Sequence, residues 1–168
     1  MNIAFVSSEV VPFAKTGGLA DVVEALPREL EKLGHHPVVF VPAYRQTRHC
    51  GLPIEETDIE VSVVVGAKVV AGRLLLSRLP NSQVPVYLIQ QDQYFDRDEL
   101  YGGGKDYIDN CERFVFFSRA VLEAIRLLQL DIDVIHCNDW QTGLIPAYLS
   151  VEYAQVPRYE NIATLMTI

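Results

Sequence analysis

The N-terminal part of the chain alternates between short apolar runs and one helical pattern. The run from Asn2 to Ser7 has no polar alternation, which is typical of a strand buried on both faces of a parallel sheet. Apolar residues then recur at helical spacings from Leu19 to Leu33, which predicts an amphipathic helix that ends at Gly34. Pro27 lies inside this helix and predicts a kink or a break, because proline lacks an N–H donor and clashes one turn back. Pro37 to Val41 is a second buried strand.

This strand, helix, strand order is a βαβ unit, and ligands of such units bind outside the carboxyl ends of the strands. The segment from Ser7 to Gly18 therefore lies where a ligand is expected. After a polar loop at Pro42 to Thr57, the pattern predicts a hairpin of two strands, Asp58 to Val65 and Lys68 to Leu79, joined at Gly66-Ala67. A strand at Val84 to Gln90 and a loop at Asp92 to Lys105 follow. The rest of the chain predicts a helix at Asp106 to Leu128, a strand at Asp133 to Cys137, a helix at Asp139 to Leu149 that contains Pro146, and a strand at Asn161 to Ile168.

Together these elements predict an α/β fold: a Rossmann-like, mainly parallel sheet with flanking helices and an inserted antiparallel hairpin. The last predicted strand stops at its carboxyl end, at Ile168. In parallel α/β sheets that end carries the chemistry, so a complete domain is expected to continue beyond it. We therefore expect residues 1–168 to be a fragment of a longer chain.

Composition narrows the possible partners. The chain carries 14 basic and 22 acidic side chains, a net charge of −8, whereas a protein that binds nucleic acid needs a basic face. A single cationic site can still bind a phosphorylated small ligand against this overall charge. No apolar run approaches the roughly 18 residues of a membrane span, and the N-terminus does not read as a signal peptide. The 3 cysteines, Cys50, Cys111 and Cys137, are odd in number and lack Cys-x-x-Cys spacing, so we expect buried free thiols in a reducing cytoplasm. The histidines show no metal-ligand spacing with them, so we expect no bound metal.

The strongest local feature is the sequence Lys15-Thr16-Gly17-Gly18-Leu19-Ala20-Asp21. The two glycines let the backbone approach a ligand closely. The helix that follows points its N-terminus at the same place, where free N–H groups and the dipole favour an anion, and Lys15 adds a full positive charge. This pattern predicts a cradle for a diphosphate, although it is neither a Gly-x-Gly-x-x-Gly fingerprint nor a Walker A loop. The alternative interpretation is a simple turn with a solvated lysine.

Several motifs together resemble one known family, the bacterial glycogen synthases and plant starch synthases. Their order and spacing match that family over essentially the whole chain. The matching segments are Ser7-Ser8-Glu9, the Lys15 to Asp21 loop, Tyr94-Phe95-Asp96-Arg97 with Leu100-Tyr101-Gly102 after it, Asp109-Asn110 followed by Arg113-Phe114, and His136-Cys137-Asn138-Asp139-Trp140-Gln141-Thr142-Gly143.

The resemblance implies the GT-B architecture, in which two Rossmann-like domains face each other across a cleft. It implies transfer of glucose from ADP-glucose to the non-reducing end of an α-1,4-glucan (glycogen) with retention, without metal or other cofactor, since ADP-glucose is a substrate. The family's His-Asn pair would begin where this chain stops, and the C-terminal nucleotide-binding domain is absent, so we expect the isolated chain to be inactive. Two alternatives stay open: a non-catalytic nucleotide- or glucan-binding module, and another GT-B glycosyltransferase, against which Lys15-Thr16-Gly17-Gly18 argues.

The resemblance also assigns donor-binding roles around the Gly-Gly pair. It places Lys15 at the phosphates of ADP-glucose and Gly17 and Gly18 near the diphosphate and the sugar. Thr16 belongs to the same donor-binding loop, and Asp21 helps to hold this loop or the sugar.

The remaining site residues come from the two later motifs. Asp139 matches an aspartate close to the glucose and the acceptor, and we take it as catalytic. Its place before a helical run also predicts a helix N-cap, and both roles can hold together. Tyr94 matches an aromatic residue that lines the cleft. Trp140 either packs in the core, which we favour, or forms a platform for the acceptor, and His136 is expected to be a packed histidine.

Overall fold

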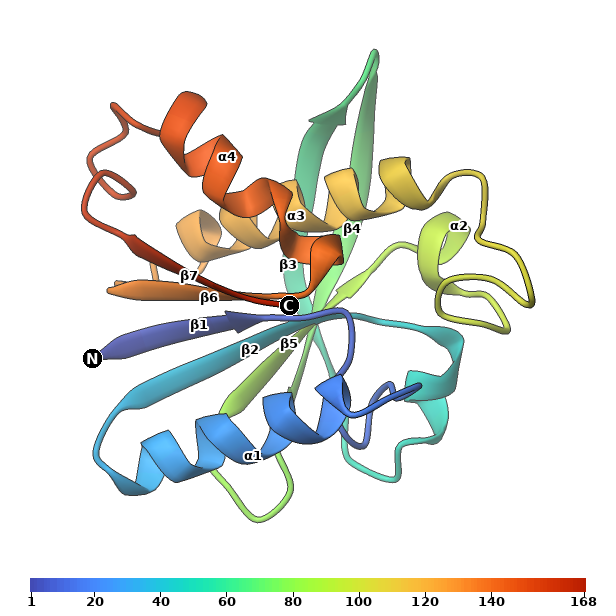
Figure 1. Ribbon diagram of the computed structural model, residues 1–168, viewed down its shortest axis with the longest axis horizontal. Coiled ribbons are helices and arrows are strands. Elements are labelled where there is room, and N and C mark those ends of the chain that lie inside the picture. Colours follow the sequence, from blue (N-terminus) through green and yellow to red (C-terminus); the bar gives the residue numbers. More distant parts are fainter.

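The computed structural model covers residues 1–168 and forms one twisted sheet between layers of helix (Figure 1). Its elements, in chain order, are β1 (Asn2–Val6), α1 (Leu19–Lys32), β2 (His36–Pro42), the 3-10 helix η1 (Arg45–His49), β3 (Glu55–Val65), β4 (Lys68–Arg78), β5 (Pro85–Gln90), α2 (Asp92–Phe95), α3 (Asn110–Leu127), β6 (Val134–Asn138), the 3-10 helix η2 (Trp140–Thr142), α4 (Leu144–Val151) and β7 (Ala163–Thr167).

The seven strands are arranged in the order β3-β4-β5-β2-β1-β6-β7. The five strands from β5 to β7 are parallel to one another, whereas β3 and β4 form an antiparallel hairpin that joins the sheet along β5. This arrangement confirms the predicted α/β fold with a mainly parallel sheet and an inserted hairpin. Gly66, at φ 60°, makes the turn of the hairpin, where a left-handed backbone favours glycine.

Alternate residues of β1 show how the sheet divides the core. Ala4 and Val6 point to the layer of α3 and α4, where they join a cluster of 28 buried residues. Ile3 and Phe5 point to the opposite layer and join a cluster of 11 buried residues, to which α1 contributes Val23. Figure 1 shows the same division, with α1 on one face of the sheet and α3 and α4 on the other. The absence of polar alternation in β1 therefore has the predicted cause, burial on both faces.

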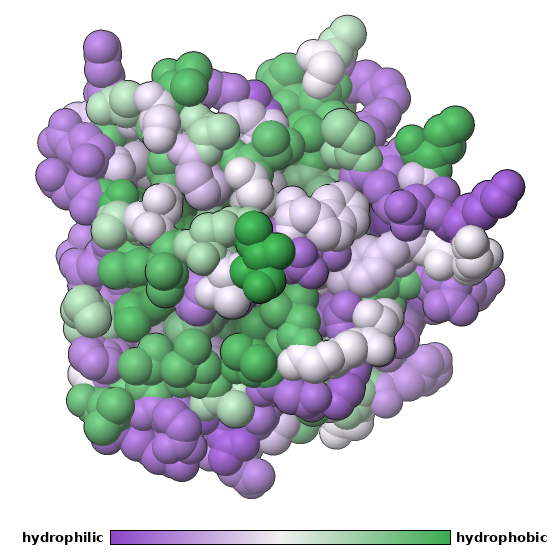
Figure 2. Space-filling view, viewed as in Figure 1, coloured by the Kyte–Doolittle hydropathy of each residue, from purple (hydrophilic) through white to green (hydrophobic).

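At the other end of the sheet order, β7 is an exposed edge strand. All five of its residues are exposed, among them Leu165 and Met166. Figure 2 shows hydrophobic side chains gathered around the C-terminal end of the chain in the same view. The apolar side chains of β7 are therefore not buried by any other part of residues 1–168.

Several predictions of local structure were wrong, among them the polar loop at Pro42 to Thr57, which contains η1 and the first residues of β3. Of the kink or break expected at Pro27, the break does not occur: α1 continues through Pro27, which is buried, and packing of the apolar face holds the helix together. The loop predicted at Asp92 to Lys105 begins with the short helix α2, whose N-cap Gln91 accepts a hydrogen bond from the Tyr94 N–H through its side chain. The helix predicted from Asp106 starts only at Asn110, because the preceding residues run as a loop.

The helix predicted from Asp139 to Leu149 also begins later. Asp139 has φ 63° and ψ 173°, a backbone conformation that ends β6 and cannot begin an α-helix. The single 3-10 turn η2 follows, and α4 starts at Leu144. Pro146 then falls in the first turn of α4, where its missing N–H removes no intrahelical hydrogen bond.

Candidate functional site

The two loops singled out from the sequence meet at one edge of the sheet. β1 and β6 are hydrogen-bonded neighbours, with Val6 opposite Cys137, so the segments that follow them leave the sheet side by side. The strand order changes direction at β1: the next strand in sequence, β2, lies on one side of it, and β6 lies on the other side. Such a change of direction opens a crevice at the carboxyl ends of the strands, which is where α/β proteins bind ligands.

A buried carboxylate organises the loop between β1 and α1. Glu9 is 4% exposed, and its Oε2 accepts hydrogen bonds from the backbone N–H groups of Thr16 at 2.6 Å and Gly17 at 3.2 Å. Its Oε1 accepts from the Thr16 hydroxyl at 2.6 Å and from the Tyr101 hydroxyl at 2.8 Å. An ionised carboxylate only accepts hydrogen bonds, and here all four neighbours donate. Glu9 was missed as a site residue, although an acidic residue directly after the first strand was the available signal.

The same contacts change what the loop offers to a ligand. The N–H groups of Thr16 and Gly17 are engaged by Glu9, so they serve the loop's own structure. The N-terminus of α1 has no side-chain cap, because its N-cap residue is Gly18. The free donors of that first helical turn are therefore the groups that an anion would meet.

Gly17 and Gly18 are not required by the fold. A Cβ atom added at either position would meet no atom within 4 Å, and neither residue has the left-handed φ that favours glycine. By contrast, a Cβ on Gly102 would lie 2.0 Å from the Lys105 carbonyl oxygen. The space above Gly17 and Gly18 is thus open, which suits close approach of a ligand to the backbone.

Lys15 and Asp21 close the loop on its solvent side. The Lys15 Nζ donates to Asp21 Oδ1 at 2.5 Å, and both side chains are about half exposed, at 50% and 58%. Asp21 lies in the first turn of α1, where a carboxylate interacts favourably with the helix dipole. The pair holds the ammonium group of Lys15 beside the uncapped helix N-terminus.

The turn after β6 carries the second predicted site residue. Asp139 has a positive φ that is essentially reserved for glycine at its ψ, so this aspartate is strained. Its N–H donates to the Thr167 carbonyl at 2.7 Å, and its carboxylate accepts from the Trp140 N–H at 2.7 Å. The predicted capping role is therefore confirmed, for the 3-10 turn η2. Strain retained at the end of a core strand is typical of a functional position.

Trp140 does not belong to the core. It is 51% exposed, so the interpretation as a core residue was wrong. One side of the ring packs edge-on against Phe114 at 5.2 Å between centroids, and Tyr101 lies 6.4 Å away. The indole is therefore supported by aromatic neighbours and at the same time exposed beside Asp139.

Tyr94, predicted to line the cleft, is almost fully buried within residues 1–168. It is 6% exposed, its ring packs against Phe95 and Phe116, and its hydroxyl donates to Glu112. Burial raises the pKa of the Tyr94 hydroxyl, and the neighbouring Glu112 carboxylate raises it further. Within residues 1–168 this side chain therefore packs in the core and does not line an open surface.

Comparison with known proteins decides the family. The profile of the starch synthase catalytic domain matches residues 2–168. The chain belongs to this family. The starch synthase domain fold is also found in the catalytic domain of starch synthase IV from Arabidopsis thaliana bound to ADP and acarbose, with a TM-score of 0.87 and 27% sequence identity over 98% of this chain. This likeness agrees with the GT-B fold class expected for the family.

Bacterial relatives of this starch synthase domain are named glycogen synthases. The chain is 48% identical over 169 residues to the glycogen synthase of Syntrophotalea carbinolica and 44% identical over 178 residues to that of Rhodopirellula baltica. All of this chain is covered in both cases, but only 34% and 35% of the relatives. The chain thus spans about a third of the length of these glycogen synthases, and 33% of the Arabidopsis chain.

The Asp109-Asn110 and Arg113-Phe114 motif of the starch synthase domain has a structural role here. Arg113 is fully buried, and its guanidinium donates to the Tyr94 carbonyl at 2.7 Å, the Leu100 carbonyl at 2.9 Å and the Asn110 side chain at 2.6 Å. Burial lowers the pKa of Arg113, because desolvation disfavours the cation. The helix α3 therefore anchors α2 at Tyr94 and the following loop at Leu100.

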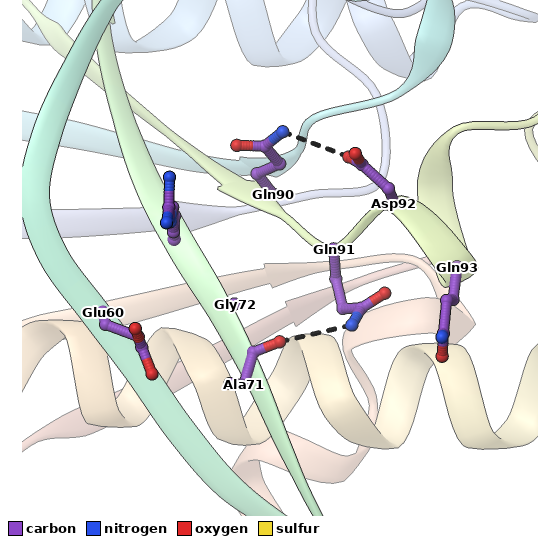
Figure 3. Close-up of a pocket in the computed structure, with 8 residues that line it drawn as sticks. Glu60, Ala71, Gly72, Gln90, Gln91, Asp92 and Gln93 are labelled. Atoms are coloured by element: carbon purple, nitrogen blue, oxygen red, sulfur yellow. Dashed lines mark hydrogen bonds between the residues drawn. The ribbon is translucent and has the colours of Figure 1, made fainter.

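A separate hollow of about 330 Å³ lies between β3, β4 and the end of β5 (Figure 3). Its wall is polar: Gln91 donates to the Ala71 carbonyl at 3.2 Å and Gln90 donates to Asp92 at 3.1 Å. Gly72 is needed there, since a Cβ would lie 2.7 Å from the Gln90 carbonyl oxygen. None of the predicted site residues of the starch synthase domain lines this hollow.

The cysteines are free, but only Cys137 is buried: Cys111 is exposed and Cys50 is partly exposed, so the expectation of buried thiols was wrong for two of them. No group of three or more His, Cys, Asp or Glu side chains is placed to hold a metal ion. No helix combines the length and the apolar character that crossing a membrane requires.

Proposed function

We propose that this starch synthase domain forms the N-terminal part of the active site of a glycogen synthase. The reaction is transfer of glucose from ADP-glucose to the non-reducing end of an α-1,4-glucan with retention of configuration, and it uses no metal or other cofactor. The names of the bacterial relatives support this reaction, and the ADP and acarbose bound to the Arabidopsis domain support a nucleotide and a glucan as ligands.

The Gly17-Gly18 pair carries the proposal. Neither packing nor backbone conformation within residues 1–168 requires these glycines, and the space beside them is open to close approach of a ligand to the backbone. The ligand must be anionic at this point, because the uncapped N-terminus of α1 and the Lys15 ammonium both face it. The diphosphate of a sugar nucleotide meets both requirements.

The chemical task is to stabilise the negative charge of the departing ADP while the sugar becomes cationic. The helix dipole and Lys15 act on the diphosphate, and Asp21 releases Lys15 from their exposed pair when a phosphate replaces it. Asp139 acts on the glucose or the acceptor hydroxyl, and Trp140 beside it supports the acceptor glucan. Thr16 holds the loop in place through its two hydrogen bonds to Glu9.

The test is a chimera in which residues 1–168 replace the matching segment of the Syntrophotalea carbinolica glycogen synthase, to which they are 48% identical. We expect the chimera to incorporate labelled glucose from ADP-glucose into glycogen, and the 168-residue chain alone to incorporate none. A chimera that folds and binds ADP-glucose or glycogen without turnover would instead favour a non-catalytic binding module.

A further inference from the structure

The hydroxyl and the ring of Tyr101 contact the two halves of the candidate site separately. The hydroxyl lies among the residues of the Gly-Gly loop, at 2.8 Å from Glu9 Oε1 and 2.7 Å from Ser8 Oγ. The ring lies 6.4 Å from Trp140 and 6.1 Å from Phe114, between centroids. Tyr101, which is not among the predicted site residues, thus contacts both the Gly-Gly loop and the surroundings of Trp140.

The direction of the hydrogen bonds follows from the number of protons. A phenol has one proton to give, and the Glu9 carboxylate has none, so Tyr101 donates to Glu9. The Ser8 hydroxyl, which is fully buried, then donates to the Tyr101 oxygen. The resulting chain runs from Ser8 through Tyr101 to Glu9 and ends at Thr16 and Gly17. Hydrogen bonds in such partly buried chains strengthen one another.

Tyr101 is itself held from the opposite side by α3. The Asn110 side chain donates to the Tyr101 carbonyl at 2.9 Å, and Arg113 in turn donates to Asn110 at 2.6 Å and to the Leu100 carbonyl. Gly102 directly after it has φ 138° and admits no Cβ, so the chain direction at Tyr101 is fixed. The buried Arg113 is thus connected to the Gly-Gly loop through one side chain.

We propose that Tyr101 is a positioning residue that aligns the donor loop through its hydroxyl and the acceptor platform through its ring. The inference rests on the proposed function for the identity of the two ligands. The proposed role predicts different kinetic effects for two substitutions of Tyr101. Tyr101→Phe removes only the hydroxyl contacts with Glu9 and Ser8, whereas Tyr101→Ala also removes the ring that supports Trp140.

Kinetics of the chimera test this separation. For Tyr101→Phe we expect KM for ADP-glucose to rise roughly tenfold, as for the loss of one hydrogen bond to a charged group, while KM for glycogen stays within about twofold. For Tyr101→Ala we expect both KM values to rise. Tyr87→Phe is the matched control: its ring stacks on Phe40 and its hydroxyl makes no hydrogen bond within the chain, so both constants should stay at parent values.

A double-mutant cycle shows whether the hydroxyl acts through Glu9. Tyr101→Phe should add little to the effect of Glu9→Gln if both belong to one chain of hydrogen bonds. Fully additive effects would overturn the proposal, as would a Tyr101→Phe variant that matches Tyr87→Phe or one that raises both KM values equally.

Amide hydrogen exchange on the 168-residue chain gives a readout that does not depend on turnover. In Tyr101→Phe the Thr16 and Gly17 amides, which donate to Glu9, should exchange several-fold faster, with no change in Tyr87→Phe. Unchanged exchange at both amides would overturn the proposed alignment of the loop. If the parent chimera lacks glucosyl transfer, the proposed function fails, while the exchange measurement still decides the role of Tyr101 in the loop.

Discussion

Lys15 and Asp21 form an ion pair of 2.5 Å across the Gly-Gly loop, and neither side chain is buried. Exposed pairs of this kind contribute about 0–1 kcal/mol to folding, because water and salt screen them and ordering both side chains costs entropy. The pair therefore has little value as a structural device. The ion pair instead keeps the Lys15 ammonium group beside the N-terminus of α1.

Lys15→Ala should accordingly separate binding from stability. In the chimera we expect affinity for ADP-glucose to fall about 10- to 150-fold, the loss of one charge-assisted hydrogen bond of roughly 1.5–3 kcal/mol. The free energy of unfolding should change by less than about 1 kcal/mol. Lys15→Arg should be intermediate, because it keeps the charge on a bulkier group. Kinetics of Lys15→Ala within twofold of the parent would show that the lysine is only solvated surface.

Gly17→Ala tests whether the open space above the loop is reserved for a ligand. The substitution meets no atom of the chain within 4 Å, so stability should stay the same or rise by about 0.4–1 kcal/mol. Affinity for ADP-glucose should fall at least tenfold, because the added methyl group occupies the space of the diphosphate. Isothermal titration and chemical denaturation of the same variant measure the two effects. A variant with unchanged affinity would contradict the proposed place of the donor.

Much of the fold could be predicted because its signals are local. The unalternating strand β1, the periodicity of α1 and the hairpin turn at Gly66 are each determined by neighbouring residues in the sequence. The break expected at Pro27 did not occur, because burial of that face against the sheet outweighs one lost backbone hydrogen bond. That packing involves strands far away in sequence and leaves no local sign.

The candidate site could be predicted less well for the same reason. The burial of Tyr94 depends on Phe116 from α3, and the exposure of Trp140 depends on which side of the ring Phe114 covers. The strained backbone of Asp139 is fixed by a hydrogen bond to Thr167 on a neighbouring strand. The sequence motifs indicated which segments belong to the site, but these long-range contacts decide which side chains face outward.

Asp139→Gly and Asp139→Ala should differ in stability and agree in activity. Both remove the cap on η2, but glycine adopts φ 63° and ψ 173° freely, whereas alanine keeps the strain. We expect the glycine variant to be more stable than the alanine variant by about 1–3 kcal/mol. Glucosyl transfer by the chimera should be lost in both, because the carboxylate is gone. Equal stability would mean that the backbone relaxes, and retained turnover would exclude Asp139 as catalytic.

His136 should make the stability of the domain depend on pH. Burial lowers the pKa of His136 below the ordinary value of 6.5. Its ring centroid lies 5.0 Å from that of Phe5, and its Nε2 forms a hydrogen bond of 2.8 Å with Thr167 Oγ1. The unfolded chain takes up a proton near pH 6.5 while the folded chain resists it, so this contribution to stability is complete above that pH. It is lost as the pH falls from 6.5 towards the lowered pKa. Denaturation from pH 8 to 5 should show a smaller loss in His136→Gln than in the parent. Identical slopes in His136→Gln and the parent would contradict the assignment.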